Sequence, residues 1–174
     1  MPLHRVMVLP IRLLVSRYRL LSSLLSDEFR TSPELEALAA RVILGAVMPR
    51  DKLDRLFHAV APDIRYQQKY ETTIASVRPH PAPVALERGY GDCKDKAVLL
   101  IQLGKLAGLR LPFALLRSTS AGQMQRDIPH QQFNHAIVYV PEQAGIEAAF
   151  FSIRPRMGST SATCGATIRA RSRW

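Results

Sequence analysis

The stretch of sequence that decides the fold spans residues 89–108 and reads GYGDCKDKAVLLIQLGKLAG. The two glycines at its start allow a tight turn, and Asp92 is a residue type that caps helix N-termini. The residues that follow are apolar on most sides of a helix, which is typical of a helix buried in the core. We therefore expect a buried helix that begins at Cys93 and is closed by Gly108.

Upstream of this stretch, the spacing of apolar residues predicts two more helices. Ser32 is suited to cap the first, with Pro33 in its first turn, and Gly45 suits its end. Asp51 is suited to open the second helix, and Pro62 to end it. Both helices are expected to turn apolar side chains inward, so the N-terminal half of the domain should be helical.

Shorter segments surround the buried helix. Residues 64–66 favour a short extended piece, and residues 78–83 favour a loop, because three prolines remove backbone donors there. Residues 109–116 and 133–140 predict two strands of an antiparallel sheet, separated by a polar loop. Helices followed by such a sheet indicate an α+β fold.

The composition of the 174 residues indicates one globular domain with a basic segment at each end. Lys and Arg total 24 against 14 Asp and Glu, which gives a formal net charge of +10. Residues 1–25 contain four arginines and residues 152–174 contain five, with no carboxylate in either segment. We expect a basic N-terminal helix or extension over residues 1–30, one domain over residues 31–151, and a basic tail without regular structure over residues 152–174.

The position of the charge bears on possible partners. Because the excess lies at the ends and the middle is close to neutral, specific nucleic-acid recognition is not expected. A nucleic-acid or membrane binder that uses both arginine-rich ends stays as an alternative, and the basic N-terminus could make weak contact with a membrane surface. The best apolar stretch, residues 6–25, is interrupted by three arginines, so it predicts neither a spanning helix nor a signal peptide. From the sequence as it stands we expect a cytoplasmic protein, and the sequence leaves its oligomeric state open.

Cys93 and His135 are the residues best suited to chemistry. The start of a helix is expected to lower the pKa of a thiol, because backbone amides stabilise the thiolate. His135 lies within an expected apolar strand and is suited to take up the thiol proton, since imidazole titrates near neutral pH. The competing interpretations are residues that merely fill the core, and a zinc site that adds Cys164 but lacks a close pair of ligands.

The same residues carry a family resemblance. Residues 88–97, RGYGDCKDKA, resemble the nucleophile segment of bacterial transglutaminase-like domains in the papain-like cysteine superfamily. Residues 133–141, FNHAIVYVP, are similar to the histidine strand of that family, and residues 64–66 and 79–81 fit its upstream pattern. The resemblance covers residues 34–150 and implies a papain-like core, with a helical N-terminal half packed on an antiparallel sheet.

The resemblance implies a thiol acyltransferase, or an amide or peptide hydrolase, that acts on peptide or protein substrates without a metal or an organic cofactor. Cys93 would attack the carbonyl carbon, His135 would move the proton, and water or an amine would resolve the acyl-enzyme. The backbone amide of Cys93 is the first expected oxyanion donor. The second comes from upstream in this superfamily, which points to Tyr66, Gln67 or Gln68. Family members are frequently exported, so a periplasmic or membrane-associated location stays open.

The third member of the triad is missing from its expected place and is therefore unknown. The family pattern puts an aspartate on the strand after the histidine strand, but this chain has no aspartate after Asp127. Glu142 and Glu147 are the only later carboxylates, and neither matches that position. The alternative to an enzyme is an inactive module of the same fold that binds peptides or proteins.

A break in composition after residue 151 offers an explanation for the missing aspartate. The apolar run 148–151 is followed by the arginine-rich, acid-free tail, where a continued strand is expected. Either the protein is a degenerate member of the family, or the reading frame was lost near Ser152, and we favour the second explanation. Translation of the other two frames of the gene past residue 151 tests it. An aspartate within a patterned continuation is expected, and its absence from both frames would contradict the idea.

Overall fold

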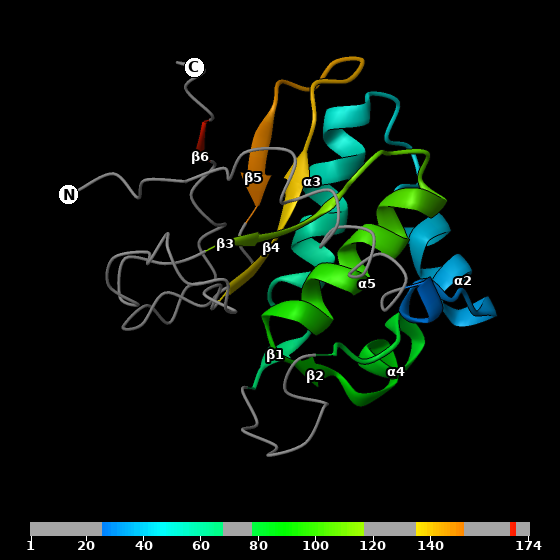
Figure 1. Cartoon of the computed structure of the whole chain (residues 1–174). Helices are drawn as coiled ribbons and strands as arrows, with labels where there is room; N and C mark the ends of the chain where they lie inside the picture. Colours follow the sequence, from blue (N-terminus) through cyan, green and yellow to red (C-terminus); the bar gives the residue numbers. More distant parts are fainter. Residues whose placement is uncertain (1–25, 68–77, 117–134, 152–167, 170–174) are drawn as a thin grey trace, which may run out of the picture.

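Figure 1 shows the computed structural model of the chain, which describes residues 26–67, 78–116, 135–151 and 168–169. The helices are the 3-10 helix η1 (Ser26–Phe29), α2 (Pro33–Val42), α3 (Pro49–Val60), α4 (Ala82–Arg88) and α5 (Cys93–Leu106). The strands are β1 (Arg65–Tyr66), β2 (Tyr90–Gly91), β3 (Phe113–Leu116), β4 (His135–Val140), β5 (Ala149–Phe151) and β6 (Ile168–Arg169). The architecture is α+β.

Helix α5 is the centre of the fold. Its side chains at Leu99, Leu100 and Leu103 are completely buried, and it packs against η1, α2, α3, α4 and β4. Figure 1 shows α5 crossing the molecule, with β3, β4 and β5 along one side and α2 on the other. The expected buried helix is confirmed, including its start at Cys93 and a left-handed turn at Gly108, where φ is +78°.

Helices α2 and α3 correspond to the two helices expected upstream, with shifted ends. The backbone N–H of Leu35 donates to Ser32 Oγ at 3.3 Å, so Ser32 caps α2 as predicted. Helix α2 ends before Gly45, which forms part of the following turn with φ +76°. Helix α3 begins at Pro49 rather than at Asp51, because a proline fits the first helical position, where its missing N–H would have no helical partner.

The expectation of a loop over residues 78–83 is wrong for its last two residues. Helix α4 begins at Ala82, and Pro83 occupies its first turn. Proline breaks the interior of a helix but is tolerated in the first turn, because the N–H groups there have no carbonyl to bond. The helix ends at Gly89, which has φ +64°.

Strands β3, β4, β5 and β6 form an antiparallel sheet in that order, and β1 pairs in parallel with β2. Strand β3 is shorter than the strand expected over residues 109–116. The first part of that segment packs on α5 instead: a Cβ added at Gly104 would lie 2.2 Å from Leu111 Cδ1. Close packing of Leu111 on α5 therefore uses residues that the sequence pattern assigned to the sheet.

Both ends of the described chain differ from the expected boundaries. Helix η1 packs against α5 although it precedes the expected boundary at residue 31, and Glu28 is only 2% exposed. At the other end, β6 pairs with β5 inside the tail for which no regular structure was expected. The open backbone groups of an edge strand explain how a short segment can pair there. A basic helix or extension was expected over residues 1–30, and residues 1–25 of that segment lie outside the described residues.

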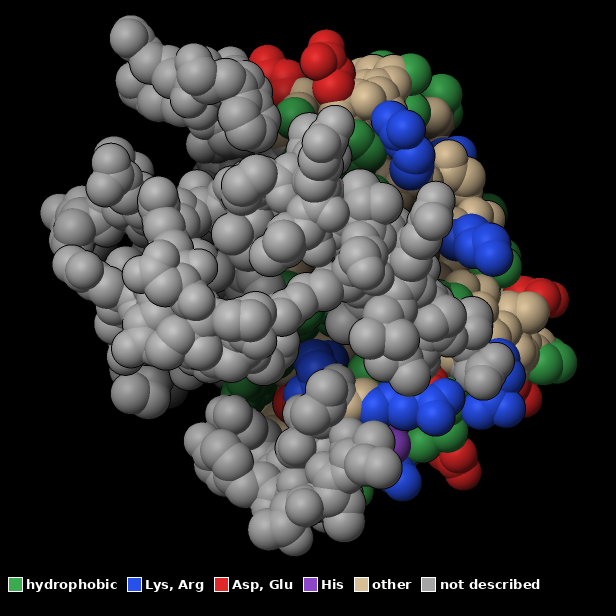
Figure 2. Space-filling model, in the orientation of Figure 1, with side chains coloured by type: hydrophobic (Ala, Val, Ile, Leu, Met, Phe, Trp, Pro, Cys, Tyr) green, Lys and Arg blue, Asp and Glu red, His purple; other side chains and the backbone are tan. Residues whose placement is uncertain are grey.

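Charged side chains of both signs are mixed on the described surface. Figure 2 shows Lys and Arg side chains among Asp, Glu and apolar ones on one face of the molecule. This mixture fits the nearly neutral middle of the sequence. No helix within the described ranges has the length and apolar character needed to cross a membrane.

A buried lysine joins α5 to the end of α3. Lys96 is 2% exposed, and its Nζ donates to the backbone oxygen of Ala61 at 2.8 Å and to that of Ile64 at 2.6 Å. Such carbonyl groups lack partners within a helix that has just ended. Burial lowers the pKa of Lys96 to about 8. The lysine therefore fixes the turn between α3 and β1.

We expect Lys96 to make the folded state more stable as pH rises from about 8 to 10.5. In this range the unfolded chain keeps the proton that the folded chain has lost, so the free energy of unfolding rises, by up to about 3 kcal/mol. Below this range both states hold the proton and the gain is absent. Denaturant titrations of the parent and of Lys96→Met, at matched pH values, measure the effect. Parallel pH dependences of the two proteins would contradict the lowered pKa.

Candidate active site

A capping box builds the start of α5. The Asp92 carboxylate accepts hydrogen bonds from the backbone N–H of Lys94 at 2.8 Å and of Asp95 at 3.2 Å. In return, the Asp95 carboxylate accepts from the backbone N–H of Asp92 at 3.0 Å. These bonds satisfy donors that a helix leaves open at its start. Cys93 is thereby fixed as the first residue of α5, as the sequence predicted.

Gly91 makes room for this cap. A Cβ at Gly91 would lie 2.6 Å from the Cβ of Asp95 and 2.8 Å from its Oδ2, closer than such atoms approach in proteins. The sequence pattern assigned this glycine to a tight turn. In the structure, its missing side chain also lets the Asp95 carboxylate fold back against the chain.

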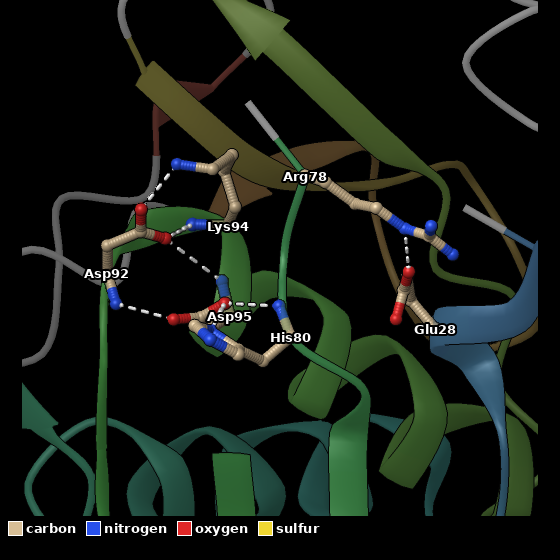
Figure 3. Close-up of polar contacts among 6 residues, drawn as sticks. All are labelled: Glu28, Arg78, His80, Asp92, Lys94 and Asp95. Carbon is tan, nitrogen blue, oxygen red and sulfur yellow. Dashed lines mark hydrogen bonds and ion pairs between the residues drawn. The ribbon is translucent and has the colours of Figure 1, made fainter. Parts of the chain in front are cut away.

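Residues 78–80, here named the strap, tie the start of α5 to η1 (Figure 3). The backbone N–H of His80 donates to Asp95 Oδ1 at 2.7 Å, and His80 Nδ1 lies 3.2 Å from the same oxygen. Two residues earlier, Arg78 is paired with the buried carboxylate of Glu28. The proline-rich segment that precedes α4 is therefore held on both sides by polar contacts.

The parallel pair β1–β2 brings the upstream oxyanion candidates to the start of α5. Arg65 is paired with Tyr90, and Tyr66 with Gly91. The backbone N–H of Gln67 donates to the Gly91 oxygen at 2.9 Å. Tyr66 and Gln67 thus lie beside the two residues that lead into the capping box.

These two candidates occupy opposite faces of the β1–β2 pair, because successive side chains of a strand alternate. Gly91, which is level with Tyr66, faces Asp95 of α5, so Tyr66 lies on the helix side. Gln67 shares the other face with Arg65, whose Nη2 donates to Gln67 Oε1 at 2.9 Å. The structure therefore separates two residues that the sequence treated alike.

The sulfur of Cys93 lies against the start of β4. The backbone amide of Ala136 lies close enough to this sulfur to lower the pKa of the thiol. The preceding residue, His135, is the first of β4 and is 8% exposed. Packing of α5 on β4 thus brings the thiol to the backbone next to the histidine, although the two residues are far apart in the sequence.

Burial raises the pKa of the Cys93 thiol above its ordinary value. The Ala136 amide opposes this rise, the Asp92 carboxylate adds to it, and the Lys94 ammonium opposes it. Lys94 is itself paired with Asp92, so the two side chains act on the thiol together. The expected lowering of the thiol pKa is therefore wrong for this structure, because desolvation outweighs the helix N-terminus.

Several other sequence candidates lie away from this site or outside the described residues. Gln68, and the Cys164 of the zinc alternative, lie outside them. Within the described ranges, no group of three or more His, Cys, Asp or Glu side chains is arranged to hold a metal ion. Glu142 and Glu147 are exposed and follow the end of β4 opposite to His135. A strand of this length spans about 17–20 Å, so neither glutamate is positioned to orient the imidazole.

We expect Cys93 to react slowly with iodoacetamide at neutral pH, with a pKa above that of the same cysteine in the unfolded chain, because burial disfavours the thiolate. Asp92→Asn should lower this pKa, since it removes a negative charge and keeps a good helix cap. Lys94→Met should raise it. Alkylation at Cys93, followed by mass spectrometry across pH, measures all three proteins. Shifts of the same sign in both variants would contradict the assigned causes.

Comparison with known proteins gives a likeness of fold. No protein-family model matches the chain, and no curated protein matches it. Among solved structures, it is similar to a crystal structure described as "a putative protease from Parabacteroides distasonis ATCC 8503", with a TM-score of 0.54 and 13% sequence identity. The match covers 76% of this chain and 28% of that one, so this chain spans less than a third of that protein. The fold described above is thus similar to one part of a larger protein.

Proposed function

We propose that the protein is a thiol-dependent enzyme of the transglutaminase-like, papain-like type, which acts on an amide bond of a peptide or protein. It would hydrolyse that bond or transfer the acyl group to an amine. The observation that carries the proposal is the packing of α5 on β4: the Ala136 amide acts on the Cys93 thiol, so the sulfur lies beside the strand that His135 begins. Likeness to part of a structure described as "a putative protease" supports a peptidase-like activity.

The raised pKa of Cys93 defines the first proposed step. Because the thiol is largely protonated at neutral pH, its proton passes to the imidazole of His135 as the sulfur attacks the carbonyl carbon. The imidazolium then donates this proton to the leaving amine as the carbon–nitrogen bond breaks, and a thioester remains. Water or a second amine attacks the thioester and gives a proton to the same imidazole, which returns the proton to the departing sulfur, so that the thiol is restored.

Two hydrogen-bond donors are proposed to stabilise the negative charge that develops on the carbonyl oxygen. The backbone N–H of Cys93 is the first, since N–H groups in the first turn of a helix have no helical partner. Gln67 is favoured over Tyr66 as the second, because a hydrogen bond from Arg65 already holds its side chain and so preorganises it. Arg65 holds the Oε1 end of the Gln67 amide, so its nitrogen is the end able to donate. One such donor contributes about 3–4 kcal/mol to transition-state stabilisation in enzymes.

A second candidate function is an inactive module that binds peptides at the same place. The observation in its favour is the half-buried thiol with a raised pKa, because a cysteine used only for packing needs no stabilised thiolate. The two candidates differ in turnover, since the module would bind a peptide without breaking any bond.

Cys93→Ala should abolish turnover, and His135→Ala should lower kcat by about 10²–10⁴-fold, which is the usual contribution of a positioned base. Activity is measured as the release of labelled fragments from a fluorescent protein substrate such as casein. A parallel reaction contains a fluorescent primary amine. Incorporation of this amine that depends on Cys93 would identify a transferase, and fragment release without incorporation would identify a hydrolase.

A control for these variants comes from a residue outside the proposed site. His58→Ala, at an exposed position of α3, should keep the parental activity. Gln67→Ala should lower kcat more than Tyr66→Phe does. Equal activity of the parent and Cys93→Ala would overturn the thiol mechanism. Binding of a labelled peptide by both proteins, without turnover by either, would favour the inactive module.

A further inference from the structure

We infer that Arg65 forms a subsite for a carboxylate of the substrate, a few residues from the amide bond that reacts at Cys93. This inference rests on the proposed function and narrows its substrate class. The substrates would be peptides or proteins that carry an acidic side chain or a terminal carboxylate near the reacting bond.

Two contacts hold the guanidinium of Arg65 in place. Its Cζ lies 5.9 Å from the centroid of the Tyr90 ring, within the range of a cation–π interaction. Its Nη2 donates to Gln67 Oε1 at 2.9 Å. Because a guanidinium carries five N–H donors, this single bond leaves most of them for a ligand. An arginine held in this way loses less conformational entropy on binding than one that rotates freely.

The charge of Arg65 is not neutralised by the described part of the chain. Arg65 is exposed and forms no ion pair there, and the acidic residue closest in sequence, Asp63, is not paired with it. By contrast, Arg50, Arg78 and Lys94 are each paired with a carboxylate. The positive charge on this face of β1–β2 is therefore available to an anion from outside the chain.

Strand register gives the position of Arg65 relative to the candidate nucleophile. Arg65 is paired with Tyr90, which comes three residues before Cys93. With about 4.8 Å between paired strands and about 3.3 Å per extended residue, the Cα atoms of Arg65 and Cys93 lie within about 15 Å. An extended peptide covers this distance in about four residues. The acidic group is therefore expected roughly two to four residues from the reacting bond.

The geometry of arginine favours a carboxylate as the ligand. A planar guanidinium donates two parallel hydrogen bonds to the two oxygens of one carboxylate, which a rotating ammonium group cannot do. Gln67, proposed above as an oxyanion donor, is bonded to the same guanidinium. A substrate anion on Arg65 would thus lie on the same face of β1–β2 as the donor to the reacting carbonyl.

The test uses short alanine-based peptides, amidated at the C-terminus, in which one Glu is moved through successive positions and matched by a Gln peptide. A further set carries Gln and a free C-terminal carboxylate, so that the two sources of the anion are distinguished. Binding to Cys93→Ala is measured by fluorescence anisotropy, and cleavage by the parent is measured by mass spectrometry. We expect Glu at one position to bind about tenfold more tightly than Gln, the usual effect of a charged hydrogen bond.

Arg65→Met, added to Cys93→Ala, should remove this preference, and Arg65→Lys should keep only part of it, because the charge stays but the planar fork is lost. Arg88→Met is the matched control. It removes one positive charge from an exposed arginine at the end of α4, outside β1, and should leave the preference unchanged.

The possible results separate this inference from the proposed function. No preference for a carboxylate in any set, or an equal preference with and without Arg65, would overturn the subsite. A uniform fall in kcat in Arg65→Met, with no change in the ratio of Glu to Gln peptides, would mean that Arg65 only positions Gln67 and would also overturn it. Carboxylate-dependent binding without any cleavage by the parent would support the subsite and contradict the proposed catalysis.

Discussion

The buried carboxylate of Asp95 is the contact on which the start of α5 depends. It is 5% exposed and accepts hydrogen bonds from the backbone N–H groups of Asp92 and His80, so one side chain joins the helix, the turn before it and the strap. A buried donor left without its acceptor costs about 1–3 kcal/mol, which makes this carboxylate hard to replace. The next residue, Lys96, donates hydrogen bonds to the backbone oxygens of Ala61 and Ile64, which follow α3. Two neighbouring charged residues therefore anchor an otherwise apolar helix to segments on different sides of it.

The same anchoring explains the state of the thiol. Cys93 sits in the first turn of a helix, which by itself favours the thiolate, but close packing of α5 on β4 removes water from the sulfur. The effect of burial is larger than that of the helix start, so the pKa of Cys93 rises. A neutral thiol is protected from alkylation and oxidation, which act on the thiolate. Its use in catalysis then requires a base that takes the proton during attack, and His135 is proposed for that role.

The short parallel pair β1–β2 gives the site its two sides. The side that carries Tyr66 is turned to the helix, and the other carries Arg65, Gln67 and Tyr90, joined by a hydrogen bond and a cation–π contact. A substrate that enters from solvent would meet the second side. Likeness to one part of a larger solved protein concerns the fold alone, and the chemistry proposed for β1–β2 rests on these residues.

Helix capping and apolar periodicity, which depend on residues close in the sequence, were enough to predict much of the structure. Ser32 and Asp92 cap their helices as expected, and the apolar run after Cys93 forms the buried helix, because capping and periodicity are local properties. Local rules failed at α4, where a proline lies in the first turn of a helix, and at Leu111, which packs on α5 instead of joining the sheet. The raised pKa of the thiol, the partners of the buried lysine and the separation of the two oxyanion candidates emerged only from the tertiary structure. Desolvation and strand register are set by segments far apart in the chain, and no local pattern contains them.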